Sequence, residues 1–359
     1  MSRLRSAALA TISFFLTFVI NGQQAFSLMA FLTHQHQSSR LPTLLASSSP
    51  LATDESSTIA NATEKFTSRK FCVYMEDTDA YGVMYNSNYA RQYERALIHS
   101  PRNDDAKRKQ WVLTAITNQK FRSSPTLGSE YVITGQLLES VADSIEVWQM
   151  ELRSTDGEAD VIVYNAATVT LASTPHPVTS PDVDISSSSS SSGLYHKQSF
   201  PCYPDEFDTH LQQTTNADNQ TIQQHAYHIP MRSVTNFFER HRTIYLGGPD
   251  KLRKMQQEDG ILFVVTACDD ANIWLDAIDG ANHFLGRDVI VETKFVIKRR
   301  GMVVECYHRL LMDMDEEGES SSKSRKLLAK ATMTCMALNR DTHRPTSKLP
   351  KWLMDLLIS

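Results

Sequence analysis

Two carboxylates, Asp77 and Asp79, stand two positions apart in the stretch EDTDAYGVMYNSNYARQYERA, which covers residues 76–96. Gly82 follows them and permits a sharp turn or the close approach of a ligand. Asn86 or its neighbour can cap a helix that starts there, and an amphipathic run with three tyrosines continues beyond the glycine. The stretch therefore predicts a pair of acids on a turn that leads into a helix.

The start of such a helix suits one kind of chemistry. Its first backbone N–H groups lack partners within the helix and lie at the positive end of the helix dipole, where negative charge on an oxygen is stabilised. The oxyanion formed when a thioester carbonyl is attacked carries such a charge. A carboxylate on the preceding turn, such as Asp79, can attack the carbonyl carbon itself or activate a water, and the residues leave both roles open. An aspartate at a turn is otherwise most often a cap or a turn former.

The same stretch resembles the signature of the 4-hydroxybenzoyl-CoA thioesterase family, which reads approximately V-x-Y-x-D-T-D-x-x-G-V-V-Y-x-x-N-Y and continues into a helix with F/Y-E-x-A. The matching residues are Val73, Asp77, Thr78, Asp79, Gly82, Val83, Tyr85, Asn88, Tyr89, Tyr93, Glu94 and Ala96. The resemblance implies the hotdog fold, a long helix wrapped by an antiparallel sheet, and hydrolysis of an acyl thioester. It also implies that Asp79 is catalytic and that a helix-start amide near Asn86 polarises the carbonyl. Some relatives carry a histidine at the position of Asn86, whereas here a side-chain amide can donate instead.

Further residues of the motif are expected around the substrate. Asp77 can contact it or orient the turn through backbone N–H groups, and the sequence leaves both open. The flanking tyrosines can line an acyl pocket or pack in the core with a hydrated hydroxyl. The predicted substrate-binding residues are Tyr74, Asp77, Gly82, Val83, Tyr85, Asn88 and Tyr89.

The sequence past residue 66 divides into two similar blocks, 67–173 and 226–359. Each has a helical segment followed by stretches in which β-branched and aromatic residues alternate with polar ones, the period of antiparallel strands. The predicted elements are a helix at 86–99 with strands at 110–121, 130–154 (a hairpin) and 159–173, then a helix at 232–248 with strands at 260–278, 287–313 (a hairpin) and 326–342. We therefore expect an α+β chain of two tandem hotdog domains.

Residues 174–225 separate the blocks and contain seven consecutive serines with nearby prolines, which predicts a flexible linker. Local matches connect the blocks, since VLTAITNQ faces VVTACDDA and LGSEYVITGQ faces LGRDVIVETK. Aligning FERHR on YERAL places Gln224 where Asp79 would be, so the second block is expected to be degenerate. It would then supply the opposite wall of one site at a two-fold interface within the chain.

Two features of the second block have ordinary interpretations beside functional ones. The acids in CDDAN, residues 268–272, are expected in a surface turn, although Asp269, Asp270 or Asn272 can also face the shared site. The run RHR at 240–242 is expected on a solvated helix face, although its arginines suit a coenzyme A phosphate.

Composition and charge exclude several classes of protein. Hydrophobic residues make up 41% and charged residues 21% of the 359, which is ordinary for globular proteins, and a net charge of −5 gives no basic surface for nucleic acid. The five cysteines are widely spaced without a CxxC pair, so we expect reduced, buried thiols rather than disulfides or a zinc site. Zinc patterns, glycine-rich phosphate loops and G-x-S-x-G elbows do not occur, and we expect no metal and no cofactor.

The N-terminus has the plan of a targeting segment. Arg3 and Arg5 precede an apolar run at 7–20, which is short for a membrane span. This predicts a signal peptide cut after Ala25, with no stable membrane insertion of the mature chain, and a signal anchor is the alternative. Residues 26–66 suit a transit segment, and the phenylalanine directly after the cut resembles the bipartite presequences of algae with secondary red plastids. The expected location is a plastid, with the secretory pathway as the alternative.

The expected activity is that of a hydrolase acting on an acyl-CoA or acyl-ACP thioester. Aryl substrates such as 1,4-dihydroxy-2-naphthoyl-CoA and fatty acyl substrates both remain open, as do coenzyme A and acyl carrier protein as the carrier. A non-catalytic acyl-thioester-binding hotdog protein is one alternative. A hotdog hydratase or dehydratase is another, but such enzymes pair an acid with a histidine, and neither His99 nor His196 has that pattern. The paired blocks can form a monomer or a homodimer.

Overall fold

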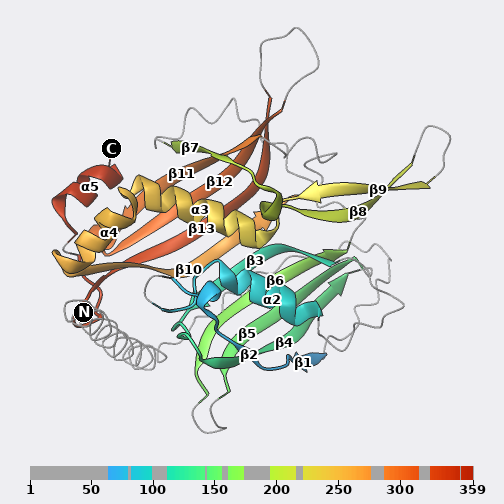
Figure 1. Ribbon diagram of the computed structural model, residues 1–359, viewed down its shortest axis with the longest axis horizontal. Helices are drawn as coiled ribbons and strands as arrows, with labels where there is room; N and C mark the ends of the chain where they lie inside the picture. The colour runs from blue at the N-terminus through green and yellow to red at the C-terminus, as the bar shows by residue number, and fades with distance from the viewer. Residues whose placement is uncertain are drawn as a thin grey trace, which may run out of the picture.

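The computed structural model describes residues 64–79, 82–98, 111–141, 144–155, 161–173, 195–215, 221–275, 287–314, 324–347 and 349–358. It consists mostly of antiparallel strands with few helices (Figure 1). We call residues 64–173 the first half and residues 195–358 the second half. The predicted signal peptide, most of the transit segment and the serine run lie outside the described residues.

Each half has a short strand, a 3₁₀ turn, a long helix and then four long strands. The first half contains β1 (Lys65–Thr67), β2 (Phe71–Cys72), η2 (Met75–Asp77), α2 (Asn88–Ile98), β3 (Trp111–Phe121), β4 (Glu130–Val141), β5 (Ile145–Ser154) and β6 (Val163–Ser173). The second half contains β7 (His196–Pro201), η5 (Pro204–Glu206), β8 (Asp208–Thr215), β9 (Thr221–His228), α3 (Met231–Tyr245), α4 (Gly248–Gln257), β10 (Ile261–Ile273), β11 (Asp288–Lys298), η7 (Arg299–Gly301), β12 (Val303–Met314), β13 (Ser324–Asn339) and α5 (Lys351–Ile358).

One antiparallel sheet runs through both halves in the order β1-β4-β5-β6-β3-β10-β13-β12-β11-β7, with β2 paired to β4. The halves meet where β3 pairs with β10, from Ala267 opposite Lys120 to Asn272 opposite Ala115. β8 and β9 form a separate hairpin that projects away from the sheet (Figure 1). The two halves are therefore joined by strand pairing.

The second half repeats the layout of the first. β2, α2, β3, β4, β5 and β6 take the same places in their half of the sheet as β7, α3, β10, β11, β12 and β13. The match extends to an irregularity, because β3 and β10 each bulge at a left-handed residue, Asn118 with φ 54° and Asp270 with φ 53°. A bulge at the same position in both strands agrees with the alignment of VLTAITNQ on VVTACDDA.

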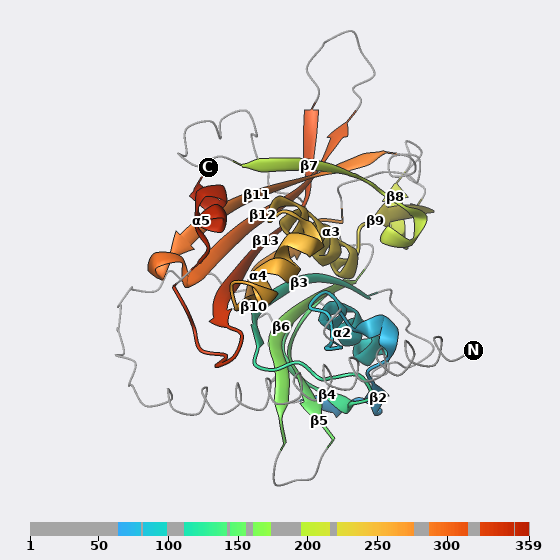
Figure 2. The ribbon, with the colours of Figure 1, turned by 60° about the vertical axis from the view of Figure 1, so that its left-hand side comes forward.

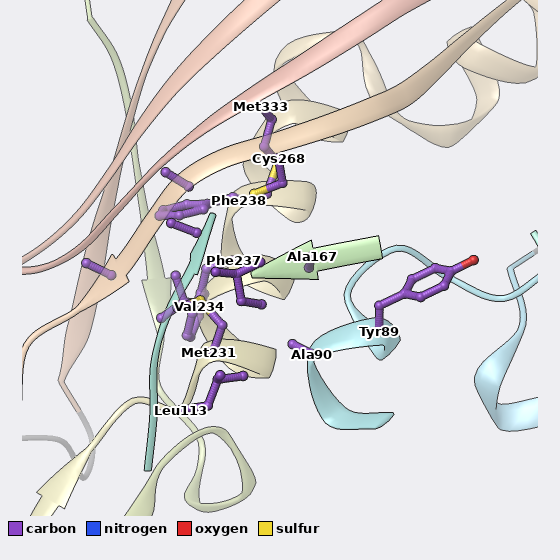
Figure 3. Close-up of a cluster of buried hydrophobic side chains, with 14 of the residues drawn as sticks. Tyr89, Ala90, Leu113, Ala167, Met231, Val234, Phe237, Phe238, Cys268 and Met333 are labelled. Carbon is purple, nitrogen blue, oxygen red and sulfur yellow. The ribbon is translucent and has the colours of Figure 1, made fainter. Parts of the chain in front are cut away.

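The helices α2 and α3 lie on the same side of the sheet, and the strands of each half curve around one of them (Figure 2). α2 directs Tyr89, Tyr93 and Ala96 into the interior at spacings of four and three residues, as one helix face requires. α3 directs Val234 and Phe238 inward in the same way. Most buried apolar side chains of both halves form one hydrophobic cluster, part of which is drawn in Figure 3. Large aromatic side chains dominate the energetics of such a core.

The second half begins earlier than the sequence predicts. β7, η5, β8 and most of β9 lie within 196–225, the stretch assigned to the linker. The residues of β8 and β9 are mostly threonine, glutamine and histidine, so the apolar alternation that identifies a strand is absent. The first half also begins ahead of the boundary expected at residue 67, since β1 includes Lys65 and the buried Phe66. α4 and α5 have no counterpart among the predicted elements.

Candidate active site

Asp77 braces the turn that precedes α2. Its side chain is 1% exposed, and it forms an ion pair with Arg91 at 2.5 Å. The carboxylate also accepts hydrogen bonds from the Tyr74 amide at 3.1 Å and from Gln92 Nε2 at 3.3 Å. A buried carboxylate needs such partners because its removal from water is otherwise costly. These bonds to the Tyr74 amide and to two side chains of α2 support the predicted orientation of the turn by Asp77.

The turn is bonded directly to the start of the helix. The carbonyl oxygen of Asp77 accepts hydrogen bonds from the Tyr85 amide and from Asn88 Nδ2, both at 2.9 Å. Asn88 is the first residue of α2, so its side chain ties the turn to the helix. The first amides of α2 have no carbonyl four residues earlier in the helix. The positive end of the helix dipole therefore lies beside the two acids.

Asp79 stands at the base of a tight loop closed by Gly82 and Val83. The Asp79 amide donates to the Val83 carbonyl at 2.9 Å, and the Gly82 amide donates to the Asp79 carbonyl at 3.0 Å. The Val83 amide also donates to Asp79 Oδ1 at 3.4 Å. Gly82 has φ 72°, a left-handed conformation that glycine adopts without strain. The predicted glycine turn is therefore present, and the side chain of Asp79 is half-buried.

We call residues 74–79, which carry Asp77 and Asp79, the acid turn. The other motif residues lie at the surface, in the core or next to this turn. Tyr74 is 62% exposed, so it does not pack in the core. Its backbone amide, rather than its ring, holds the turn. Tyr89 and Val83 are buried members of the core, whereas Tyr85 and Asn86 are half-buried between the turn and the helix.

Tyr85 lies where the first half meets α3. Burial raises the pKa of its phenol. The positive charge of Arg242 opposes this rise, the carboxylate of Asp79 adds to it, and Arg240 opposes it again. Such interactions weaken with distance, so Tyr85 is close both to the acid of its own half and to the arginines of the other. The charges of α3 therefore reach the residue that joins the acid-bearing turn to α2.

Two residues of the run RHR at 240–242 are buried, so the predicted solvated helix face is wrong for them. Arg242 is 4% exposed, ion-paired with Glu239, and donates from Nη1 to the sulfur of Met333 at 3.1 Å. His241 is 2% exposed, and only Arg240 of the three is at the surface. The sequence signal was available, because the helical period places residues 241 and 242 on the inward face that 234 and 238 define.

The second half contains a counterpart of the acid turn. η5 follows Tyr203, whose amide donates to Glu206 Oε2 at 3.0 Å, which matches the bond between the Tyr74 amide and its acid. Glu206 is 6% exposed and ion-paired with Arg240 of α3, just as Asp77 is paired with an arginine of α2. Both halves therefore use a buried acid to hold a 3₁₀ turn against their helix.

The two turns align as YMEDTD at 74–79 and YPDEFD at 203–208, so Asp208 is the counterpart of Asp79. The alignment that placed Gln224 at this position is wrong. It failed because the hairpin β8–β9 stands between the second turn and its helix, where the first half has only a short loop. The recurring pattern Y-x-x-acid-x-D is the sequence signal that reveals the correct match.

The acids of CDDAN lie on the surface of β10. Asp269 and Asp270 are exposed, and Asp270 is paired with Lys330 of β13 at 2.8 Å. Asn272 donates to the Asp270 carboxylate at 2.8 Å. The segment is a bulge within β10 rather than the predicted turn, although the predicted exposure of the two acids is confirmed.

The described residues hold no group of three or more His, Cys, Asp or Glu side chains placed to bind a metal ion. All five cysteines are free thiols, and four of them are buried, as the sequence predicts. Within the same part of the chain, none of the helices combines the length and apolar character that crossing a membrane requires.

No family model matches the sequence, and no curated protein matches it. Several solved structures are similar to the chain. A candidate oleoyl thioesterase from Lactobacillus plantarum has a TM-score of 0.46 and 9% identity over 79% of this chain and 97% of its own. The 12:0-ACP thioesterase from Umbellularia californica has a TM-score of 0.43 and 13% identity over 79% and 94%. The 4-hydroxybenzoyl-CoA thioesterase from a Pseudomonas strain has a TM-score of 0.26 and 14% identity over 30% and 84%.

Proposed function

We propose that the chain hydrolyses the thioester of an acyl-CoA or an acyl-ACP, with one active site between two tandem hotdog domains. The observation that carries this proposal is the acid turn of the first half. Asp79 is held there on a glycine loop, the turn is bonded to the first residue of α2, and the charges of two α3 arginines reach the nearby Tyr85. Three features that acyl transfer needs are thus close together: an acid, a glycine turn and a helix start.

The mechanism assigns one task to each of these groups. The thioester carbonyl oxygen binds at the start of α2, where backbone amides and the side-chain amide of Asn86 receive the negative charge that develops. The carboxylate of Asp79 either attacks the carbonyl carbon, giving a mixed anhydride that water then hydrolyses, or removes a proton from a water that attacks the carbonyl carbon. On both routes the carbon–sulfur bond breaks, and the carrier leaves as a thiol that carries one proton of that water. Arg242 is buried and paired with Glu239, so it holds the α3 side of the site in place rather than supplying an unpaired positive charge.

Turnover of a panel of thioesters by the purified chain tests this function. The panel contains aryl and fatty acyl groups, each on coenzyme A and on acyl carrier protein, because the acid turn does not distinguish them. Asp79→Asn is expected to lower kcat by about 10²- to 10⁴-fold with little loss of stability, because the residue lies on a loop rather than in the core. Asp250→Asn is the matched control, since this acid lies on α4 and is 90% exposed. Near-normal turnover by Asp79→Asn would exclude the mechanism.

We also propose that residues 1–66 address the protein to a plastid. The support is the basic start, the apolar run at 7–20 and the phenylalanine after Ala25. A fluorescent protein fused after residue 66 is expected to enter plastids of an alga with secondary red plastids. Phe26→Ala is expected to leave it outside them, and secretion of both fusions would favour the alternative address.

A further inference from the structure

A bridge of three charged residues joins the two halves between their helices. Arg232 of α3 donates from Nη1 to Glu94 Oε2 of α2 at 3.3 Å and from Nη2 to Asp208 Oδ1 at 2.6 Å. The side chains of Arg232 and Glu94 are 28% and 21% exposed, and that of Asp208 is 40% exposed. We call these three residues the interhelix bridge.

The interhelix bridge uses the acid of the second turn. Asp208 is the counterpart of Asp79, yet in the second half this carboxylate is bound by Arg232 and linked through it to α2. An isolated ion pair at the surface contributes little to stability. A single guanidinium shared between two partly buried carboxylates is held more strongly, because each hydrogen bond is charge-assisted.

We propose that Arg232 is a positioning residue for the active site, which fixes α2 against α3 by binding Glu94 and Asp208 together. The inference rests on the proposed function, because the start of α2 is the part of the site that receives the carbonyl oxygen. The acid turn is bonded to α2, and the arginines whose charges reach the nearby Tyr85 belong to α3. The spacing of the two helices therefore sets the distance across the site, where a misplacement of about 1 Å can lower turnover substantially.

Glu94 makes the interhelix bridge dependent on pH. Burial raises its pKa to about 7; the charges of Arg232 and Arg91 oppose the rise, and Asp208 adds to it. Above this pH Glu94 is a carboxylate and the bridge has its full charge, whereas below it the neutral acid accepts from Arg232 more weakly. Since the folded pKa lies above the ordinary value of 4.5, protonation favours the folded state, and stability falls as the pH rises from 4.5 to about 7.

Hydrogen exchange of the α2 amides tests the bridge without relying on catalysis. Exchange is measured by mass spectrometry on the full chain at pH 8 and pH 6, with each rate corrected for its intrinsic pH dependence. Arg232→Met is expected to speed exchange in α2 by about tenfold at pH 8 and by less at pH 6. Arg253→Met is the matched control, because it removes an exposed pair with Asp250 on α4 and is expected to leave α2 unchanged. Unchanged α2 exchange in Arg232→Met would overturn the proposal.

Glu94→Gln gives a second, milder variant should Arg232→Met fail to fold. It is expected to speed α2 exchange in the same direction and to remove the loss of stability between pH 4.5 and 7. If Glu94→Gln kept the full loss of stability between pH 4.5 and 7, Glu94 would not be the group that causes this loss.

Kinetics separate this inference from the proposed function. Arg232→Met is expected to lower kcat by about tenfold with little change in KM, and Arg232→Lys to recover part of the loss. Equal kcat in Arg232→Met and the wild-type chain would overturn the positioning role. Arg232→Met can also speed exchange in α2 while the wild-type chain hydrolyses no thioester. That result would overturn the proposed function and support the bridge alone.

Discussion

The two acid turns of the molecule have the same scaffold and different uses. In each, a buried acid, Asp77 or Glu206, accepts from the amide three residues earlier and pairs with an arginine of the following helix. The second acid then differs, since Asp79 accepts from the Val83 amide of a glycine loop while Asp208 is bound by an arginine. The buried acid therefore belongs to the fold, whereas the second acid is followed by a glycine loop in one half and by a hairpin in the other.

The interiors beneath the two helices differ as well. Gly135 stands opposite Met150 across β4 and β5, and Thr293 stands opposite His308 at the matching position across β11 and β12. Thr293 is hydrogen-bonded to His308 at 2.8 Å and to His241 of α3 at 2.6 Å. The first half thus keeps an apolar interior where the second half buries two histidines, so the halves are expected to respond differently to acid.

Replacing the two buried acids, Asp77 and Glu206, is expected to give the largest difference in stability between the two turns. Asp77→Ala leaves Arg91 without its ion-pair partner and releases the turn from α2, so a loss of about 3–5 kcal/mol of unfolding free energy is expected, together with most of the thioester turnover. Glu206→Ala is expected to lose only about 1–2 kcal/mol, because its partner Arg240 is 45% exposed and water can replace the carboxylate. Urea unfolding and kcat/KM of both variants measure the difference. Equal losses in the two would show that the two turns depend equally on their buried acids.

Much of the fold can be predicted from sequence because its signals are local. The long strands alternate in burial along their length, as β5 does, and α2 begins and ends within two residues of its predicted bounds. The motif also placed Asp79, Gly82 and the helix start together. These local patterns do not show whether Asp77 contacts the substrate or orients the turn. The ion pair with Arg91, which supports orientation of the turn, becomes visible only in the folded chain.

The failures share one physical cause, which is that insertions and polar strands leave no periodic signal. The hairpin β8–β9 shifted the alignment of the second half, hid Asp208 and made most of 196–225 resemble a linker. Buried charged residues were missed for a related reason. Arg242 and His241 are polar residues, but their positions on α3 face the interior. Their burial is tolerated because each has a polar partner, Glu239 for Arg242 and Thr293 for His241, and these pairs become apparent only in the folded chain.

Acid should destabilise the second half before the first. Burial lowers the pKa of His241 to about 4, and burial together with Arg242 lowers the pKa of His308 well below its ordinary value. Both histidines stay neutral when folded but bind protons when unfolded, so stability is lost as the pH falls below about 6.5; His241 alone is expected to lose about 3 kcal/mol by pH 4.

His308→Met tests the contribution of one histidine, because it gives the second half the residue that the first half has at the matching position, Met150. The variant is expected to unfold at nearly the wild-type urea concentration at pH 7.5 and at a higher concentration than wild type at pH 5. Met150→Leu, a change of similar size in the first half, serves as the control and should leave the pH dependence unaltered. An identical pH dependence in wild type and His308→Met would show that this histidine does not contribute.

The smallest expected effect concerns Gly135 of β4, in the apolar interior of the first half. A Cβ atom at Gly135 would overlap the ring of Phe66, which is buried and packs edge-on against Trp148 with ring centroids 5.4 Å apart. Gly135→Ala is therefore expected to lower the unfolding free energy by about 2 kcal/mol through overpacking, whereas the matching position in the second half already carries the larger Thr293. In a Phe66→Ala background the same change should have almost no effect, because the space is then empty. Unfolding of the two single variants and the double variant measures the coupling, and losses that simply add would show that the ring of Phe66 is not what requires a glycine there.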